Sequence, residues 1–217
     1  PHAPVAPRRR PAVACPRFPH MARLARSSIV GYPHHVTQRG NYDQVTFEAE
    51  ADYRLYLEWL RDYADRFGVG VWAYCLMPNH VHFVCVPEAE GALARAFNTL
   101  HMRYAQHFNR RRSLQGHLWR ARFMSCMLDG PSALEEMRFI ENNPVRAGLA
   151  ALAEDYPWSS ALSHVTGAPA PALDGCDLLA SAGPSWGDYL RQGADEPAIR
   201  RVRERLRTGR PAGDLEF

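Results

Sequence analysis

Two histidines separated by a single residue stand in the segment PNHVH, residues 78–82. Side chains two positions apart on a β-strand point to the same face, about 6–7 Å apart, so His80 and His82 are expected to project together. Neutral imidazole binds divalent transition metals well, and two such rings can share one ion. The surrounding sequence is apolar, where two polar rings are costly without a partner. The pair therefore predicts a metal site; two histidines on a polar sheet face, satisfied by solvent or backbone, are the alternative.

The stretch between Gly91 and Leu128 carries one sign of charge, because it holds seven arginines and no Asp or Glu. His117 and Trp119 lie among these arginines, which are Arg95, Arg103, Arg110, Arg111, Arg112, Arg120 and Arg122. A groove that follows a phosphate backbone needs such cations together with an aromatic stacking surface. Arg39 and Arg23 extend the set. The block predicts nucleic-acid binding, with a solvated basic loop as the alternative.

The composition is that of an ordinary globular protein. The chain has 217 residues, of which 46% are hydrophobic and 23% charged, enough for one well-buried domain and too apolar for a disordered protein. No run approaches about 18 apolar residues, so no transmembrane helix is expected. All 26 basic residues are arginines, which indicates either nucleic-acid binding or a genomic composition bias. The five cysteines form no C-x-x-C pair, and we expect reduced thiols in a cytoplasmic protein.

The elements that must position these residues follow from the hydrophobic periodicity. The pattern predicts strands over 34–38, 69–77, 80–86 and 122–128, and helices over 49–67, 91–109 and 131–142. Gly68 and Pro144 are expected to end the first and third helices, and 110–122 to form an arginine-rich loop. The order β-α-β-β-α-β is that of an α+β ferredoxin-like sandwich, an antiparallel sheet with helices on one face.

Composition divides the chain into three parts. Residues 1–20 are rich in Pro, Ala and Arg and lack the apolar core of a secretory signal, so they are expected to be disordered, with Met21 as an alternative start. Residues 21–167 hold the patterned sequence and form the expected domain. Residues 168–217 are an expected extension with a basic helix around 196–207, which fits either a second DNA contact or a solvated helix. The end at Phe217 favours a truncated tail.

Five sequence blocks together resemble the single-tyrosine HUH transposases of insertion sequences, including the REP-associated tyrosine transposases. They are YCLMPNHVH (74–82), HHVTQRGN (34–41), GHLW (116–119), NPVRAG (143–148) and DYPWSS (155–160), and the resemblance covers about residues 21–167. It implies a ferredoxin-like fold, in agreement with the element order. It also implies that His80 and His82 hold Mg²⁺ or Mn²⁺ against the scissile phosphate of single-stranded DNA, that a tyrosine attacks the phosphorus, and that the ligand is a hairpin with single-stranded flanks.

By the same resemblance, Asn143 stands at the position of a third metal ligand, whereas a helix would turn the adjacent Asn142 about 100° away. The family's nucleophilic tyrosine lies four residues before this ligand, one helical turn away, where this chain has Phe139. Phenylalanine has no hydroxyl and cannot form a phosphotyrosine. Three explanations fit: a natural copy that binds DNA without strand transfer, another nucleophile such as Tyr104 or a metal-bound water, or a deliberate substitution. Tyr104 also falls on the apolar stripe of its helix, as a core residue would.

The leading prediction is a cytoplasmic transposase-like protein that binds single-stranded or hairpin DNA at a divalent-metal site, with cleavage in question because of Phe139. The alternative from another class is a non-catalytic DNA-binding protein, a repressor or accessory factor, derived from the same fold. A metal-dependent hydrolase of small substrates also fits the histidine pair but leaves the arginine block without a role. Relatives include monomers and homodimers, and the sequence favours neither state.

Overall fold

The computed structural model describes residues 28–183, 185–193 and 196–208. The predicted disordered segment 1–20 and the predicted truncated end at Phe217 lie outside these residues. No helix within the described ranges combines the length and the hydropathy that a membrane span requires. Three of the described cysteines, Cys75, Cys85 and Cys126, are buried free thiols, and Cys176 is a half-buried one.

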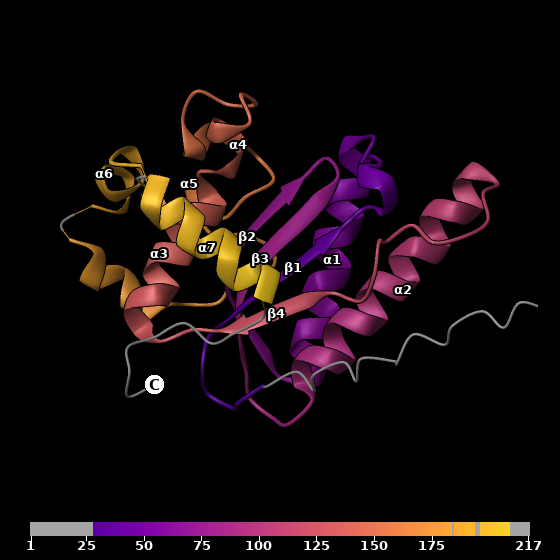
Figure 1. The fold of residues 1–217 in the computed structure, drawn as a ribbon, viewed down its shortest axis with the longest axis horizontal. Helices are drawn as coiled ribbons and strands as arrows, with labels where there is room; N and C mark the ends of the chain where they lie inside the picture. Colours follow the sequence, from indigo (N-terminus) through magenta and orange to yellow (C-terminus); the bar gives the residue numbers. More distant parts are fainter. Residues whose placement is uncertain (1–27, 184, 194–195, 209–217) are drawn as a thin grey trace, which may run out of the picture.

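A four-stranded antiparallel sheet forms the centre of the molecule (Figure 1). Its strands are β1 (His34–Arg39), β2 (Val69–Met77), β3 (His80–Pro87) and β4 (Met124–Met127), in the spatial order β2-β3-β1-β4. Helix α1 (Glu50–Phe67) connects β1 to β2, and helix α2 (Ala92–Arg112) connects β3 to β4. The predicted β-α-β-β-α-β order and the α+β ferredoxin-like fold are thereby confirmed.

Helices α1 and α2 cover one face of the sheet and share the larger hydrophobic core with it. Val81 and Phe83 of β3 point to this face, because alternate residues of a strand lie on the same side. They meet the apolar stripes of both helices, to which Tyr56 and Phe97 belong. Helix α1 ends as predicted at Gly68, whose φ of 68° suits a residue without a Cβ.

The other face of the sheet carries a second helical layer, which the prediction of helices on one face did not include. The layer consists of α3 (Gly130–Glu141), α4 (Asn143–Arg146), α5 (Ala161–Thr166), α6 (Trp186–Arg191) and α7 (Glu196–Thr208). Cys75 and Val84 of the sheet share a core with Met137 and Ile140 of α3. Figure 1 shows α7 crossing α3 and β4, which it contacts. Strand β3 is therefore covered on both faces, which explains its nearly continuous apolar sequence.

The basic helix predicted around 196–207 is confirmed as α7. Its Ile199 and Val202 are buried in the core of the second layer, so the described residues after 167 pack onto the same body as those before it. Short 3₁₀ segments occupy connections between the larger elements: η1 (Asn41–Asp43), η2 (Ala153–Asp155) and η3 (Asp177–Ala182).

Two element ends differ from the prediction near residues that matter for function. Helix α2 continues to Arg112 and ends at Ser113, so Arg110, Arg111 and Arg112 belong to a helix and not to the predicted loop. Helix α3 ends at Glu141, and Pro144 lies in the first turn of the separate helix α4. Proline suits that place because the first turn of a helix leaves its N–H groups without intrahelical partners.

Candidate metal centre and nucleic-acid interface

His80 and His82 lie on the same face of β3, as strand geometry predicts, and their ring centroids are 5.0 Å apart. Across the sheet they pair with Arg39 and Thr37 of β1. Both rings line a cleft of about 560 Å³. Side chains from β1, the segment before β4, and helices α3, α4 and α7 also line the cleft, among them Arg39, Arg120, Arg122, Phe139, Asn143, Arg146 and Arg203.

The His80 ring is oriented by a hydrogen bond at its Nδ1. Asn79 Nδ2 donates to the carbonyl of Asp43 at 3.2 Å, which fixes the orientation of the Asn79 amide. Asn79 Oδ1 therefore faces His80 Nδ1, at 2.6 Å, and can only accept. Because Nδ1 carries the proton in the neutral ring, His80 Nε2 keeps a lone pair. That Nε2 points toward the Asn143 side chain, whose Nδ2 lies 3.3 Å away.

Both rings of the pair are electrically neutral at neutral pH. Burial lowers the pKa of His80 to about 4, and nearby Arg39 adds to this effect. Burial also holds the pKa of His82 well below its usual value, with contributions from His35 and His80. Neutral imidazole is the form that binds a metal ion, so the two rings are ready to act as ligands.

Asn143, the expected third ligand, lines the same cleft as the two histidines. Its amide contacts His80 Nε2, and its Oδ1 lies 3.2 Å from Arg146 Nη2. In the described part of the chain no group of three His, Cys, Asp or Glu side chains is arranged to hold a metal ion, so the available set is two imidazoles and an amide oxygen. The amide oxygen is of the ligand type that the expected Mg²⁺ or Mn²⁺ prefers, whereas the two imidazoles also suit other divalent transition metals. Asn142 points away, since its Nδ2 donates to the Leu190 carbonyl at 3.1 Å.

Phe139 lines the same cleft. Its ring lies edge-on to His82, with 6.3 Å between the ring centroids, and its side chain is buried. The helix break at Asn142 separates Phe139 from Asn143. The prediction that both residues lie on one continuous helix is therefore wrong. They face the same cleft nevertheless. Tyr104, the alternative nucleophile, is a fully buried core residue whose hydroxyl donates to the Thr46 carbonyl at 2.7 Å.

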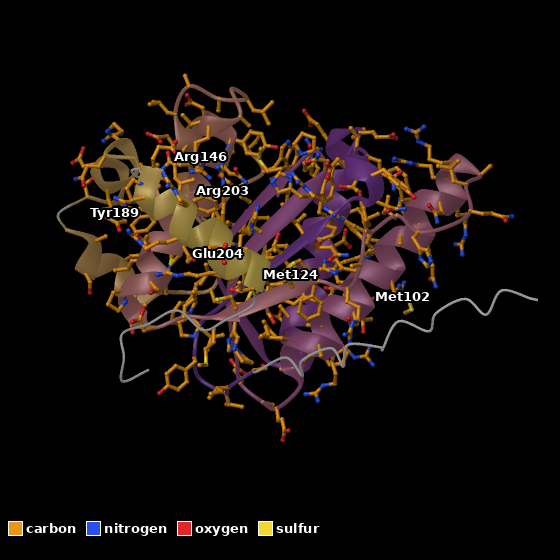
Figure 2. All side chains as sticks on the ribbon, in the orientation of Figure 1. Met102, Met124, Arg146, Tyr189, Arg203 and Glu204 are labelled. Atoms are coloured by element: carbon orange, nitrogen blue, oxygen red, sulfur yellow. The ribbon has the colours of Figure 1, made fainter. Side chains whose placement is uncertain are left out.

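Backbone pairing at the end of β1 brings three of the predicted arginines together. The Arg120 N–H donates to the Arg39 carbonyl at 2.9 Å, and the Asn41 N–H donates to the Leu118 carbonyl at 2.8 Å. Arg39, Arg120 and Arg122 consequently line the histidine cleft. Arg146 of α4 and Arg203 of α7 line it as well, and Figure 2 shows these two side chains near each other.

Arg146 and Arg203 were not among the residues predicted to bind DNA. Arg146 belongs to the block NPVRAG that carried the resemblance, and Arg203 to the basic helix. Those two signals existed in the sequence. The sequence could not show that the chain folds back and places α7 at the cleft.

The arginines at the end of α2 have other partners. Arg111 forms an ion pair with the buried carboxylate of Asp52, with 3.0 Å between Nη2 and Oδ2. Arg112 Nε donates to Glu48 at 2.7 Å. Helix α2 places these arginines beside acidic residues near the start of α1. The arginine block contains no acidic residues of its own, so its sequence gave no sign of these ion pairs. Arg103 and Arg110, which were also predicted to bind DNA, are exposed and lie outside the cleft lining. The guanidinium of Arg103 lies over the Trp59 ring.

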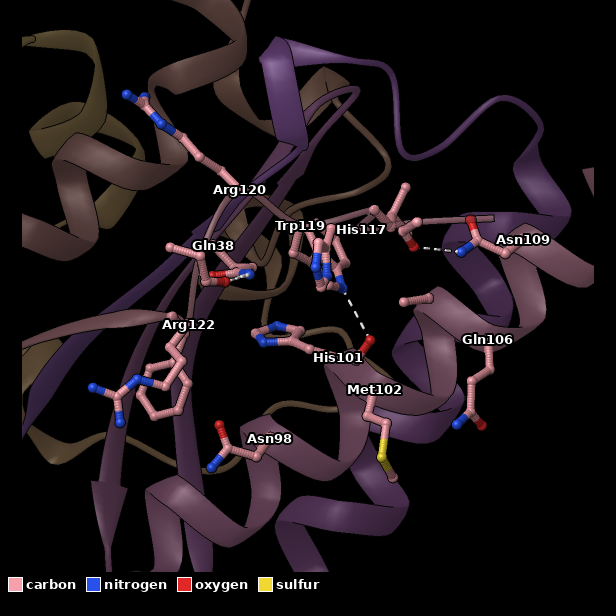
Figure 3. Close-up of a pocket in the computed structure, with 15 residues that line it drawn as sticks. Gln38, Asn98, His101, Met102, Gln106, Asn109, His117, Trp119, Arg120 and Arg122 are labelled. Atoms are coloured by element: carbon pink, nitrogen blue, oxygen red, sulfur yellow. Dashed lines mark hydrogen bonds between the residues drawn. The ribbon is translucent and has the colours of Figure 1, made fainter. Parts of the chain in front are cut away.

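A second groove of about 590 Å³ adjoins the histidine cleft and shares Gln38, Arg120 and Arg122 with it (Figure 3). Figure 3 shows Asn98, Met102, Gln106 and Asn109 of α2 on its other side. His117 and Trp119 line this groove and not the cleft. The Trp119 ring is only 8% exposed and its Nε1 donates to the His101 carbonyl at 2.9 Å, so it packs as a core residue rather than as the expected open stacking surface.

Two buried residues behind the cleft were not selected from the sequence. His35 of β1 contacts His82, with 2.8 Å between His35 Nε2 and His82 Nδ1. Glu136 of α3 contacts the other side of the His35 ring, with 2.6 Å between Oε2 and Nδ1. His35 lies within the block HHVTQRGN, which was the only sequence signal for it, and the sequence offered no signal for Glu136.

Comparisons with known proteins agree with this architecture. Residues 29–143, more than half of the chain, match the family model of IS200-like transposases. The solved structure of a REP-associated tyrosine transposase bound to a REP hairpin has 17% identity and a TM-score of 0.55, over 72% of this chain and 93% of that one. A candidate transposase from Deinococcus radiodurans R1 has 20% identity and a TM-score of 0.38, over 54% and 95%. No curated protein matches significantly. On the family match, the chain belongs to the IS200-like transposases.

Proposed function

We propose that this protein binds single-stranded or hairpin DNA in the cleft around His80 and His82, and that these histidines and Asn143 hold Mg²⁺ or Mn²⁺ there. One observation carries the proposal: two neutral imidazoles, an amide and five arginines line one cleft. The arginines give that cleft the positive charge that a phosphate backbone requires. A hairpin ligand agrees with the REP hairpin bound to the similar solved transposase, and the cytoplasmic location remains part of this proposal.

The division of labour within the cleft follows from residue chemistry. When bound, the cation would supply Lewis acidity toward a phosphoryl oxygen of the DNA. His80 and His82 present Nε2 atoms as ligands. Arginine guanidinium groups suit phosphate oxygens because they offer several N–H donors in a planar fork, and here they come both from the sheet side, as Arg120, and from the helical layer, as Arg146.

The proposed activity is DNA strand cleavage and transfer in transposition, by a chain in which Phe139 occupies the position expected for the nucleophilic tyrosine. Phe139 also supports a second candidate function. A protein that binds the same DNA without cutting it would act as a repressor or accessory factor, and the buried phenyl ring, with no hydroxyl to offer, favours that role. The two candidates share the cleft and differ only in whether a phosphodiester bond breaks.

The test is a Mn²⁺-dependent cleavage assay on a labelled hairpin with single-stranded flanks, combined with a binding measurement on the same DNA. The unchanged protein is compared with His80→Ala and with the matched control His107→Ala, which removes a histidine that packs on Trp59 of α1. Cleavage that His80→Ala abolishes and His107→Ala retains supports the transposase activity. Binding without any cleavage supports the accessory role. Failure to bind either the hairpin or the single strand would overturn both.

A further inference from the structure

A chain of polar contacts runs through the core from α7 to the cleft. Arg205 Nη1 of α7 lies 3.5 Å from Glu136 Oε1, and Glu136 Oε2 lies 2.6 Å from His35 Nδ1. His35 Nε2 in turn lies 2.8 Å from His82 Nδ1. Glu136 and His35 are fully buried. Four different elements contribute one residue each, so this arrangement exists only in the folded protein.

The carboxylate of Glu136 sets the direction of the two hydrogen bonds that connect it to His82 through a singly protonated His35 ring. An ionised carboxylate only accepts, so His35 must donate from Nδ1 to Glu136. A His35 ring with its single proton on Nδ1 has a lone pair at Nε2, to which His82 donates from Nδ1. A neutral His82 ring with its proton on Nδ1 has a free lone pair on Nε2.

We propose that Glu136 and His35 are positioning residues, which hold the His82 ring with an unprotonated Nε2 available to the cleft and so prepare it to bind a divalent cation. This inference rests on the proposed function and deepens its metal site. Histidines that bind metals commonly donate their second N–H to a carboxylate, a carbonyl or a water, and this partner sets the tautomer. Here the carboxylate acts through an intervening imidazole.

Two features of the structure favour this role over simple core packing. A buried carboxylate is costly, and an apolar side chain at 136 would fill the core without that cost. His80 also has its Nδ1 bound to the protein, through Asn79 Oδ1. Both members of the pair thus have Nδ1 engaged by the protein body, and the Nε2 of His80 faces Asn143, the proposed third ligand. Without His35, nothing in this chain of contacts would select the tautomer of His82.

The tautomer can be measured without metal or DNA. In the metal-free protein labelled with ¹⁵N at histidine, the His82 ring is expected to show a protonated Nδ1 and an unprotonated Nε2. A protonated Nε2 on His82 in the unchanged protein would overturn the inference directly, whatever the protein does to DNA.

The second measurement is Mn²⁺ affinity, by calorimetric titration of the unchanged protein, His35→Phe and the control His34→Phe. His34 is also fully buried on β1, but its Nδ1 contacts the Tyr32 carbonyl and not the cleft. Loss of an outer partner of a metal ligand costs about 10–100-fold in metal affinity, so His35→Phe is expected to lose that much and His34→Phe to stay close to the unchanged protein. Equal affinities of the two variants would overturn the role of His35. Absence of Mn²⁺ binding by the unchanged protein would instead overturn the metal site of the proposed function.

Discussion

The guanidinium of Arg146 lies over the ring of Phe139, with its central carbon 4.1 Å from the ring centroid. Arg146 Nη2 also donates to the Phe139 carbonyl at 2.7 Å and lies 3.2 Å from Asn143 Oδ1. The Arg146 guanidinium therefore contacts both Phe139, which lacks the hydroxyl of the expected tyrosine, and Asn143, the proposed third ligand. A tyrosine at position 139 would present its phenol to a cleft that already contains a positive group, and a nearby positive charge favours the phenolate.

We expect Phe139→Tyr to create a nucleophile in an otherwise complete site. With Mn²⁺ and a labelled hairpin, this variant should cleave the DNA and become covalently linked to the new 5′ end, with a rate orders of magnitude above that of the unchanged protein. Denaturing gels of the labelled DNA detect the adduct. Phe139→Tyr combined with His80→Ala should form none. Equal cleavage by the unchanged protein and Phe139→Tyr would show that another group attacks the phosphorus.

We expect substitution of Arg120, which lines the cleft, to weaken DNA binding, and substitution of Arg111, which pairs with Asp52, to weaken the fold. Arg120→Gln removes an exposed cation from the cleft, so we expect lower affinity for single strands and a salt dependence reduced by about one counterion. Arg111→Gln leaves Asp52 buried without its cation and should lower the free energy of unfolding by about 1–3 kcal/mol, with the salt dependence unchanged. Binding isotherms at several salt concentrations and urea unfolding measure both quantities. A reduced salt dependence in Arg111→Gln would contradict this assignment.

The fold could be predicted from the sequence because its signals are local. The stripes of α1 and α2 and the short apolar run of β3 follow from spacings of a few residues, and so does the common direction of His80 and His82. Partners that are distant in the sequence could not be predicted in this way. His35 and Glu136 are 101 positions apart, and Arg111 and Asp52 are 59 apart.

The break between α3 and α4 is another feature that could not be predicted from the sequence. Counting four residues back from Asn143 assumes an unbroken helix, whereas the backbone leaves α3 at Glu141 and starts α4 at Asn143. The helical count nevertheless identified two residues that line one cleft. At the break, Asn142 has φ −82° and ψ 0°, which departs from helical values, yet α4 still places Asn143 in the cleft that Phe139 lines.

An exposed aromatic residue three positions after the cleft residue Arg39 offers a stacking surface that Trp119 does not. Tyr42 in η1 is 95% exposed, and its φ of 51° is unusual for a residue other than glycine. We expect Tyr42→Gly to weaken single-strand binding by about 1–3 kcal/mol, the value of one stacked base, and to leave the melting temperature unchanged or raised, because glycine tolerates this φ. The control is Tyr32→Gly, beyond the opposite end of β1. Equal losses of affinity in both variants would contradict a specific role for Tyr42.

The neutral state of His80 predicts how stability depends on pH in the protein freed of metal by a chelator. The pKa of His80 is about 4 in the folded protein and 6.5 when the ring is freely solvated. Between these values the unfolded chain binds a proton that the folded chain does not, so the free energy of unfolding falls as the pH drops from about 6.5 toward 4. Above 6.5 this contribution is fully present. His80→Gln has no titrating ring at this position, and its stability should fall less steeply between pH 7 and pH 5 in urea unfolding experiments. The same slope in both proteins would contradict burial of a neutral His80. Added Mn²⁺ should shift the loss of stability of the unchanged protein to lower pH, because the cation and the proton compete for His80 Nε2.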